Sequence, residues 1–237
     1  MWRSRTLLMI GITSVALAAC GSSRSREDGT LVVSWDPRDG GGLEYVGGGA
    51  ISDCAANGTD WVRAEAALRG TTQVTPFDFP CNVGRGQTTS LPAGSYDVTV
   101  SLLDSKMRAV NQVTVPMVVE RYGSSYVGPI LFQVQSWLVN WGFSLQESGV
   151  QRPSTCAEVG VKTVELIAQY GSEAQESFPF DCAPGVGVSQ AIRAGSYSYQ
   201  LNLLDAAGNL VGPKGPVTTI LVDEKARAQI STTFPFQ

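Results

Sequence analysis

Carboxylates and cysteines are the side chains of this chain with the most scope for chemistry, because its 237 residues include no histidine. That absence excludes Ser-His-Asp and Cys-His nucleophilic systems, histidine zinc sites and histidine-based pH switches. Asp36, Asp39 and Glu44 lie close together in a glycine-rich segment, where a calcium site or an acid–base pair is conceivable. The segment lacks the alternating aspartates of a calcium loop, and its counterpart later in the chain carries one carboxylate, Glu147. We therefore favour a solvated loop, and predict no metal, cofactor or catalytic residue.

The segments that must position these residues occur twice along the chain, as two related copies. The stretch AGSYDVTVSLLD, residues 93–104, returns 101 residues later as AGSYSYQLNLLD, residues 194–205. Further landmarks repeat in the same order, at offsets of 101 to 106 residues: Cys81 and Cys182, Cys54 and Cys156, Trp35 and Trp141. Such a series indicates a duplicated domain whose loops differ in length. We place the copies at residues 30–134 and 135–237.

Each copy has the pattern of short β-strands. Apolar residues alternate with polar ones along WVRAEAALRG, which predicts one inward face: Val62, Ala64, Ala66 and Leu68. The same alternation follows each AGSY turn and runs along TVELIAQY, residues 163–170. The alanine-rich AEAAL also has helical propensity, so a helix is the competing prediction there. Short alternating runs with turns about every 8–12 residues favour an all-β sandwich.

The stretch LPAGSYDVTVSLLD, residues 91–104, resembles the closing hairpin of bacterial immunoglobulin-like and prealbumin-like extracellular modules. The resemblance implies two tandem immunoglobulin-like β-sandwich domains, and it implies no particular function. Immunoglobulin domains carry their tryptophan between two cysteines, whereas Trp35 and Trp141 each precede both cysteines of their copy. The strand order is therefore left open.

Four of the five cysteines fit a disulfide framework. Three pairings of four cysteines are possible, and the duplication favours one bridge in each copy: Cys54–Cys81 and Cys156–Cys182. Each bridge would close a loop of roughly 27 residues, which stabilises the protein by about 3–4 kcal/mol in the chain-entropy model. A redox or metal role is the alternative, but it calls for closer spacing or further ligands.

The fifth cysteine, Cys20, ends a segment with the pattern of an export signal. A basic start, an apolar run and two small residues precede it, which predicts a signal peptide over residues 1–19. LAAC, residues 17–20, resembles the bacterial lipobox, which implies acylation of Cys20, palmitate included, and membrane anchoring by two or three lipid chains. An ordinary signal peptide with an incidental cysteine is the alternative. Gly21, in place of aspartate, favours the outer membrane, and residues 20–29 are predicted to be a flexible tether.

Among the tryptophans, Trp61 is the candidate for binding. Trp35, Trp137 and Trp141 share strand faces with apolar residues and are predicted to lie in the cores. The alternation places Trp61 on the polar face, where an exposed indole could stack on a sugar or anchor a partner protein. The alternative is a tryptophan that caps the rim of the sandwich.

Two classes of function agree with these features. Without its signal peptide the chain has 15 basic and 21 acidic residues, and this acidic balance argues against nucleic acid as a partner. We favour a non-catalytic lipoprotein of the cell envelope, periplasmic or surface-exposed, that contacts envelope protein or glycan. The alternative is a carboxylate-dependent hydrolase or accessory domain that acts on polysaccharide.

Overall fold

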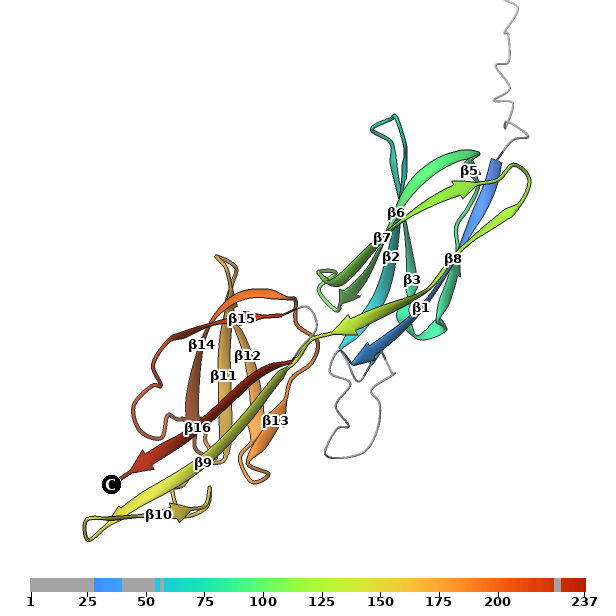
Figure 1. The fold of residues 1–237 in the computed structure, drawn as a ribbon. Helices are drawn as coiled ribbons and strands as arrows, with labels where there is room; N and C mark the ends of the chain where they lie inside the picture. The colour runs from blue at the N-terminus through green and yellow to red at the C-terminus, as the bar shows by residue number, and fades with distance from the viewer. Residues whose placement is uncertain (1–27, 40–53, 56–57, 224–226) are drawn as a thin grey trace, which may run out of the picture.

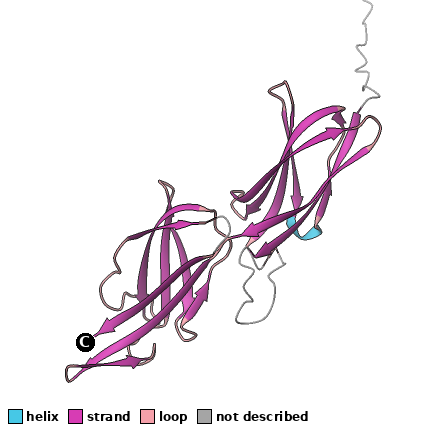
Figure 2. Ribbon diagram, viewed as in Figure 1, coloured by secondary structure: helices cyan, strands magenta, loops and turns pink. Residues whose placement is uncertain are grey.

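The computed structural model describes residues 28–39, 54–55, 58–223 and 227–237, which form two β-sandwiches arranged one after the other (Figure 1). The predicted signal peptide, Cys20 and Glu44 lie outside these residues. In the described part, the single helical element is the short 3-10 helix Cys81–Val83 (Figure 2). No helix in that part is long and apolar enough to span a bilayer.

The first sandwich packs two four-stranded sheets against each other. One sheet joins β1 (Asp28–Asp39), β4 (Arg85–Gln87), β5 (Leu91–Pro92) and β8 (Ser124–Val134). The other follows the order β3 (Val74–Pro80), β2 (Thr59–Leu68), β6 (Gly94–Asp104) and β7 (Ala109–Val119). The last strand, β8, pairs in parallel with β1, so the first and last strands lie side by side and the chain enters and leaves this domain at opposite ends.

The second sandwich repeats this plan. One sheet joins β9 (Trp137–Glu147), β10 (Val150–Ser154), β13 (Val186–Val188) and β16 (Ala228–Phe236). The other follows the order β12 (Glu176–Asp181), β11 (Thr163–Tyr170), β14 (Gly195–Leu204) and β15 (Thr218–Val222). Again the last strand, β16, runs parallel to the first, β9. The predicted all-β fold with two sandwich domains is confirmed.

The alternating pattern is expressed as predicted. AEAAL lies in strand β2, where Val62, Ala64 and Ala66 are buried while Arg63 on the opposite face is not. The ladder to β6 pairs Ala64 with Val100, so the apolar face of β2 is continuous with that of its neighbour. Strand pairing therefore outweighs the helical propensity of alanine, which is worth only tenths of a kcal/mol per residue.

Two predicted boundaries in the first copy are wrong because strand pairing extends β1 in both directions. The strand begins at Asp28, inside the predicted tether 20–29, since residues 28 and 29 pair with β5. It continues to Asp39, through the start of the predicted loop, because residues 35–39 pair with β8. These hydrogen bonds come from partners distant in sequence, β5 in antiparallel and β8 in parallel pairing, and no local pattern records them.

Each core holds the same group of residues around its disulfide. In the first copy, Trp35 Nε1 donates to the carbonyl of Cys81 at 2.8 Å, and its ring stacks on Phe79 at 5.9 Å between centroids. In the second copy, Trp141 Nε1 donates to the carbonyl of Cys182 at 3.0 Å, and its ring stacks on Phe180 at 6.0 Å. The repeated tryptophans therefore belong to the cores. Each of them also fixes the backbone at one cysteine of its disulfide through the indole hydrogen bond.

The same group explains a repeated glycine in each copy. Gly86 in β4 and Gly187 in β13 lie against the rings of Phe79 and Phe180. A Cβ atom at either glycine would overlap the ring, so any larger residue would have to displace it. By contrast, Gly142 in β9 has room for a methyl group, its nearest neighbour being the Thr233 hydroxyl oxygen at 3.9 Å from the added carbon.

Candidate functional site

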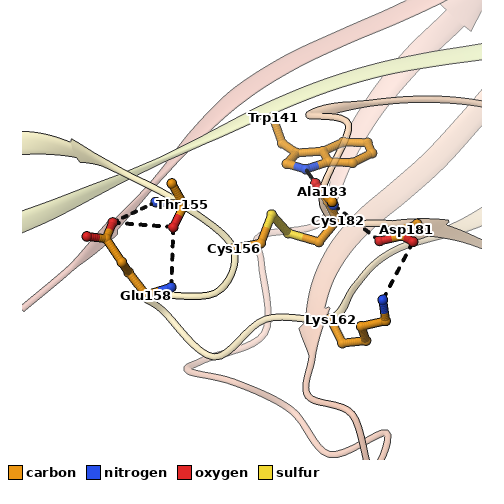
Figure 3. The surroundings of a disulfide bond; sticks show 8 residues. All are labelled: Trp141, Thr155, Cys156, Glu158, Lys162, Asp181, Cys182 and Ala183. Atoms are coloured by element: carbon orange, nitrogen blue, oxygen red, sulfur yellow. Dashed lines mark hydrogen bonds and ion pairs between the residues drawn. A yellow bond between two sulfur atoms is a disulfide. The ribbon is translucent and has the colours of Figure 1, made fainter.

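The four cysteines predicted to form disulfides do so in the predicted pairs. Cys54 is bonded to Cys81 and Cys156 to Cys182, with Cα–Cα distances of 5.9 and 6.0 Å. Figure 3 shows the second bridge beside Trp141, with the Lys162–Asp181 ion pair close by. These four cysteines are structural cross-links rather than a thiol or metal site. No group of three or more metal-ligating side chains occurs among the described residues.

Trp61 lies on the outer face of its sheet, as the alternation predicts, with 37% of its surface exposed. In the ladder it lies between Pro80 of β3 and Leu103 of β6. Leu103 is nearly buried although it shares this outer face, and directly opposed side chains in a sheet have Cβ atoms about 5 Å apart. The indole therefore has two apolar neighbours in the sheet, and its exposed part is available to a partner.

Among the residues that the structure describes, the largest group of linked charges lies between the two sandwiches. Asp104, at the end of β6, accepts hydrogen bonds from the backbone N–H groups of Lys106 and Arg108, each at 2.9 Å. The Arg108 guanidinium donates back to Asp104 through Nε at 2.8 Å, which fixes its direction. Arg108 then bonds Glu176, the first residue of β12 in the second sandwich, and Lys106 Nζ reaches the same carboxylate at 2.8 Å. We call these four residues the clasp.

The carboxylates of the clasp are held in their ionised form. Burial alone would raise the pKa of Glu176, but the hydrogen bonds from Arg108 and Lys106 outweigh it and lower that pKa. Burial likewise opposes ionisation of Asp104, and bonds from the backbone and side chain of Arg108 reverse the effect, so this pKa is also lowered. At neutral pH the clasp is therefore a set of charged pairs that share hydrogen bonds.

A second group lies beside the clasp, at the same end of the second sandwich. Glu173 accepts a hydrogen bond from Arg193, and this bond lowers the pKa of Glu173. The Arg193 guanidinium carbon lies 4.1 Å from the centroid of the Tyr170 ring, a cation–π contact. Tyr197 donates to the Arg193 carbonyl at 3.1 Å, and burial raises the pKa of Tyr197 to about 12. Arg193 is therefore fixed by a carboxylate and an aromatic ring.

Uncharged contacts complete the junction. Ala191 of the second sandwich packs against the apolar core of the first. Gly58, with a φ of +67°, lies so close to the Gln190 side chain that a Cβ atom would overlap it. Within the first sandwich, Asn111 Nδ2 at the start of β7 donates to the carbonyl of Gln133 in β8 at 2.7 Å, close to where the chain leaves that domain. The two domains are thus joined by packing as well as by ion pairs.

Sequence reasoning missed this junction, although the two copies differ at residues that form it. Arg108 corresponds to Asn209, which completes the turn after Asp205 without any positive charge. Glu176 corresponds to Thr75. A repeat that departs from its own pattern at two charged positions is the signal that could have identified the interface.

Comparisons with known proteins found weak structural similarities only. No protein-family model matches the chain, and no curated protein matches it. A putative adhesin from Bacteroides ovatus is 8% identical, with a TM-score of 0.38 over 89% of this chain and 94% of that one. A streptococcal ancillary pilin is 12% identical, with a TM-score of 0.37 over 88% and 62%. A leucine-rich repeat protein from Bacteroides thetaiotaomicron is 12% identical, with a TM-score of 0.31. The match covers 89% of this chain and only 26% of that protein.

Proposed function

We propose that this protein is a non-catalytic, lipid-anchored module of the cell envelope, in which two sandwiches are clasped into one stiff support. The observation that carries the proposal is the bonding of Lys106 and Arg108 from one domain to Glu176 of the other. Residues 135 and 136 alone separate β8 from β9, so the linker adds little freedom. A short linker and a charged, packed interface together restrict domain motion.

Two disulfides support a location outside the cytoplasm, because cytosolic thiols are kept reduced. The lipobox-like sequence at Cys20 supports anchoring of the protein to the outer membrane, either on the periplasmic side or at the cell surface. Asp28 lies eight positions after Cys20, so the first sandwich would lie at most about 28 Å from its lipid anchor. The second sandwich would then be held farther from the membrane by the clasp.

The residues at the junction favour a non-catalytic structural role over the alternative of a polysaccharide hydrolase. A general acid must keep its proton near neutral pH, which requires a raised pKa. Asp104, Glu173 and Glu176 are the carboxylates gathered at the junction, and each has its pKa lowered. Their arrangement serves binding between domains rather than proton transfer.

Replacing Glu176 by alanine is expected to release the clasp. The substitution leaves Lys106 and Arg108 without their shared acceptor, which costs about 1.5–3 kcal/mol of interdomain interaction. Small-angle scattering of the full chain in detergent should then show a broader range of interdomain distances, while each sandwich keeps its stability. Glu147→Ala, which removes an exposed ion pair with Arg152, is the matched control. An unchanged scattering profile for Glu176→Ala would refute the proposal that the clasp is what stiffens the support.

Acidification should have the same effect on the clasp. Both of its carboxylates have a lowered pKa, so their contribution is complete at neutral pH. This contribution is lost as the pH falls below the ordinary pKa values of aspartate, 3.8, and glutamate, 4.5, and then through the lowered pKa values of Asp104 and Glu176. Scattering of the unchanged chain at pH 7 and at about pH 3 measures this, with Glu176→Ala expected to show less change.

The lipid anchor is tested separately with Cys20→Ala. Labelled palmitate should be incorporated by the unchanged protein and not by the variant, which should leave the membrane fraction. Cys54→Ala is the control, since it removes a cysteine predicted to remain unacylated. Membrane association and labelling that survive Cys20→Ala would overturn the anchor and leave the clasp untouched.

A further inference from the structure

A groove of about 280 Å³ opens beside the clasp, between the first strand residues of β7 and the end of the second sandwich. We propose that this groove binds a neutral saccharide of one or two hexose units. The proposal extends the protein's role from support to recognition, and it depends on neither the lipid anchor nor Trp61. Domain junctions are common locations for ligand sites, and the groove approaches the lower end of their usual volume, about 300 Å³.

The groove is lined largely by planar polar groups. Asn111 and Gln112 line it from the first sandwich, while Arg193 and Tyr170 line it from the second. An amide offers a donor and an acceptor in one plane, which matches adjacent sugar hydroxyls that each donate and accept. The other lining residues are the small or apolar Ala109, Val110 and Ala194, which leave room for the ligand, and the buried amide residue Gln135.

Two of these groups are held in place before any ligand arrives. Asn111 is half-buried and its amide nitrogen is bonded to the Gln133 carbonyl, so the amide is held near the groove. Arg193 is held by Glu173 on one side and by the Tyr170 ring on another. A guanidinium has five N–H donors, so Arg193 retains donors for ligand oxygens while its orientation is fixed. Groups oriented in advance lose little entropy on binding.

The charge at the groove favours a neutral ligand. Arg193 is the charged residue of its lining, and Glu173 neutralises it through their direct ion pair. A phosphate or carboxylate ligand would have to compete with Glu173 for the same guanidinium. A hydroxyl-rich neutral ligand makes hydrogen bonds without separating that pair, and this distinguishes a saccharide from an anionic compound.

The test is titration of the full chain in detergent with maltose, cellobiose, lactose and N,N′-diacetylchitobiose, each followed by calorimetry. At least one disaccharide should bind, and the double variant Asn111→Ala, Gln112→Ala should weaken that binding by about tenfold or more, the equivalent of two lost hydrogen bonds. Gln151→Ala is the matched control, because it removes an exposed amide from β10 and should leave the affinity unchanged.

Three results would overturn the proposal. The first is that none of the four disaccharides binds below about 10 mM, which is weaker than a site of this kind provides. The second is that binding persists in the Asn111, Gln112 double variant, and the third is that Trp61→Ala abolishes it, which would place the saccharide on the sheet face. Cys20→Ala should bind the disaccharide normally, so loss of the anchor and loss of the groove site are separable.

Discussion

Replacing Trp141 by alanine is expected to destabilise the second sandwich by about 3–5 kcal/mol, the range for removal of a large buried aromatic side chain. Trp141 is nearly buried, stacks on Phe180, and donates to the Cys182 carbonyl. The substitution leaves a cavity and removes the indole hydrogen bond to the Cys182 carbonyl, which still accepts one from the Gly185 backbone N–H. Urea denaturation of the full chain, followed by near-ultraviolet circular dichroism, should show one of two transitions shifted to lower urea.

Trp61 provides the control for this experiment. It is more than one third exposed, and alanine there should change the free energy of unfolding by less than about 1 kcal/mol. Trp35→Ala should reproduce the effect of Trp141→Ala in the first sandwich, because Trp35 makes the same stacking contact and hydrogen bond. Equal effects of Trp61→Ala and Trp141→Ala would contradict the assignment of Trp141 to the core.

Removing the first disulfide by the double substitution Cys54→Ala, Cys81→Ala is expected to cost about 3.5 kcal/mol, the chain-entropy value for a loop of this length. The sequence separation across the bridge is 27 residues. Both cysteines are nearly buried in the first core, so the loss should fall on that sandwich. Differential scanning calorimetry should show the first domain unfolding at a lower temperature while the transition of the second domain is unchanged.

The matched variant is Cys156→Ala, Cys182→Ala, whose bridge spans 26 residues and should have a similar effect on the second sandwich alone. Peptide mapping of the unreduced protein provides a direct check. Bridges that connect the two halves, or free thiols at these four positions, would contradict the one-bridge-per-domain arrangement on which both calorimetric predictions depend.

Much of the fold could be predicted because it depends on comparisons within the sequence. Alternation of apolar and polar residues identified the inward face of β2, and the buried Val62 and Ala64 confirm it. Duplication selected the pairs Cys54–Cys81 and Cys156–Cys182 from three possibilities, and the structure has both. Period-two patterning reports which face is buried, and an internal repeat reports which landmarks share a position.

The candidate site was harder to predict because its residues come from different copies. Arg108 and Glu176 are 68 residues apart and have no shared motif. Each looks like an ordinary surface charge when only its own strand or turn is considered. Their role appears once the end of β6 and the start of β12 are brought together, and the same holds for Asn111 and Arg193 at the groove.

The sequence by itself determined that this protein is a pair of β-sandwiches, each with an internal disulfide and a tryptophan in its core. Burial alternates with every residue of a strand, and this local rule is visible in one chain. Only the tertiary structure decided that β8 and β16 return in parallel to β1 and β9, and that the domains meet through the clasp. Those contacts join segments distant along the chain, and their energy depends on how two folded surfaces are placed rather than on any local pattern.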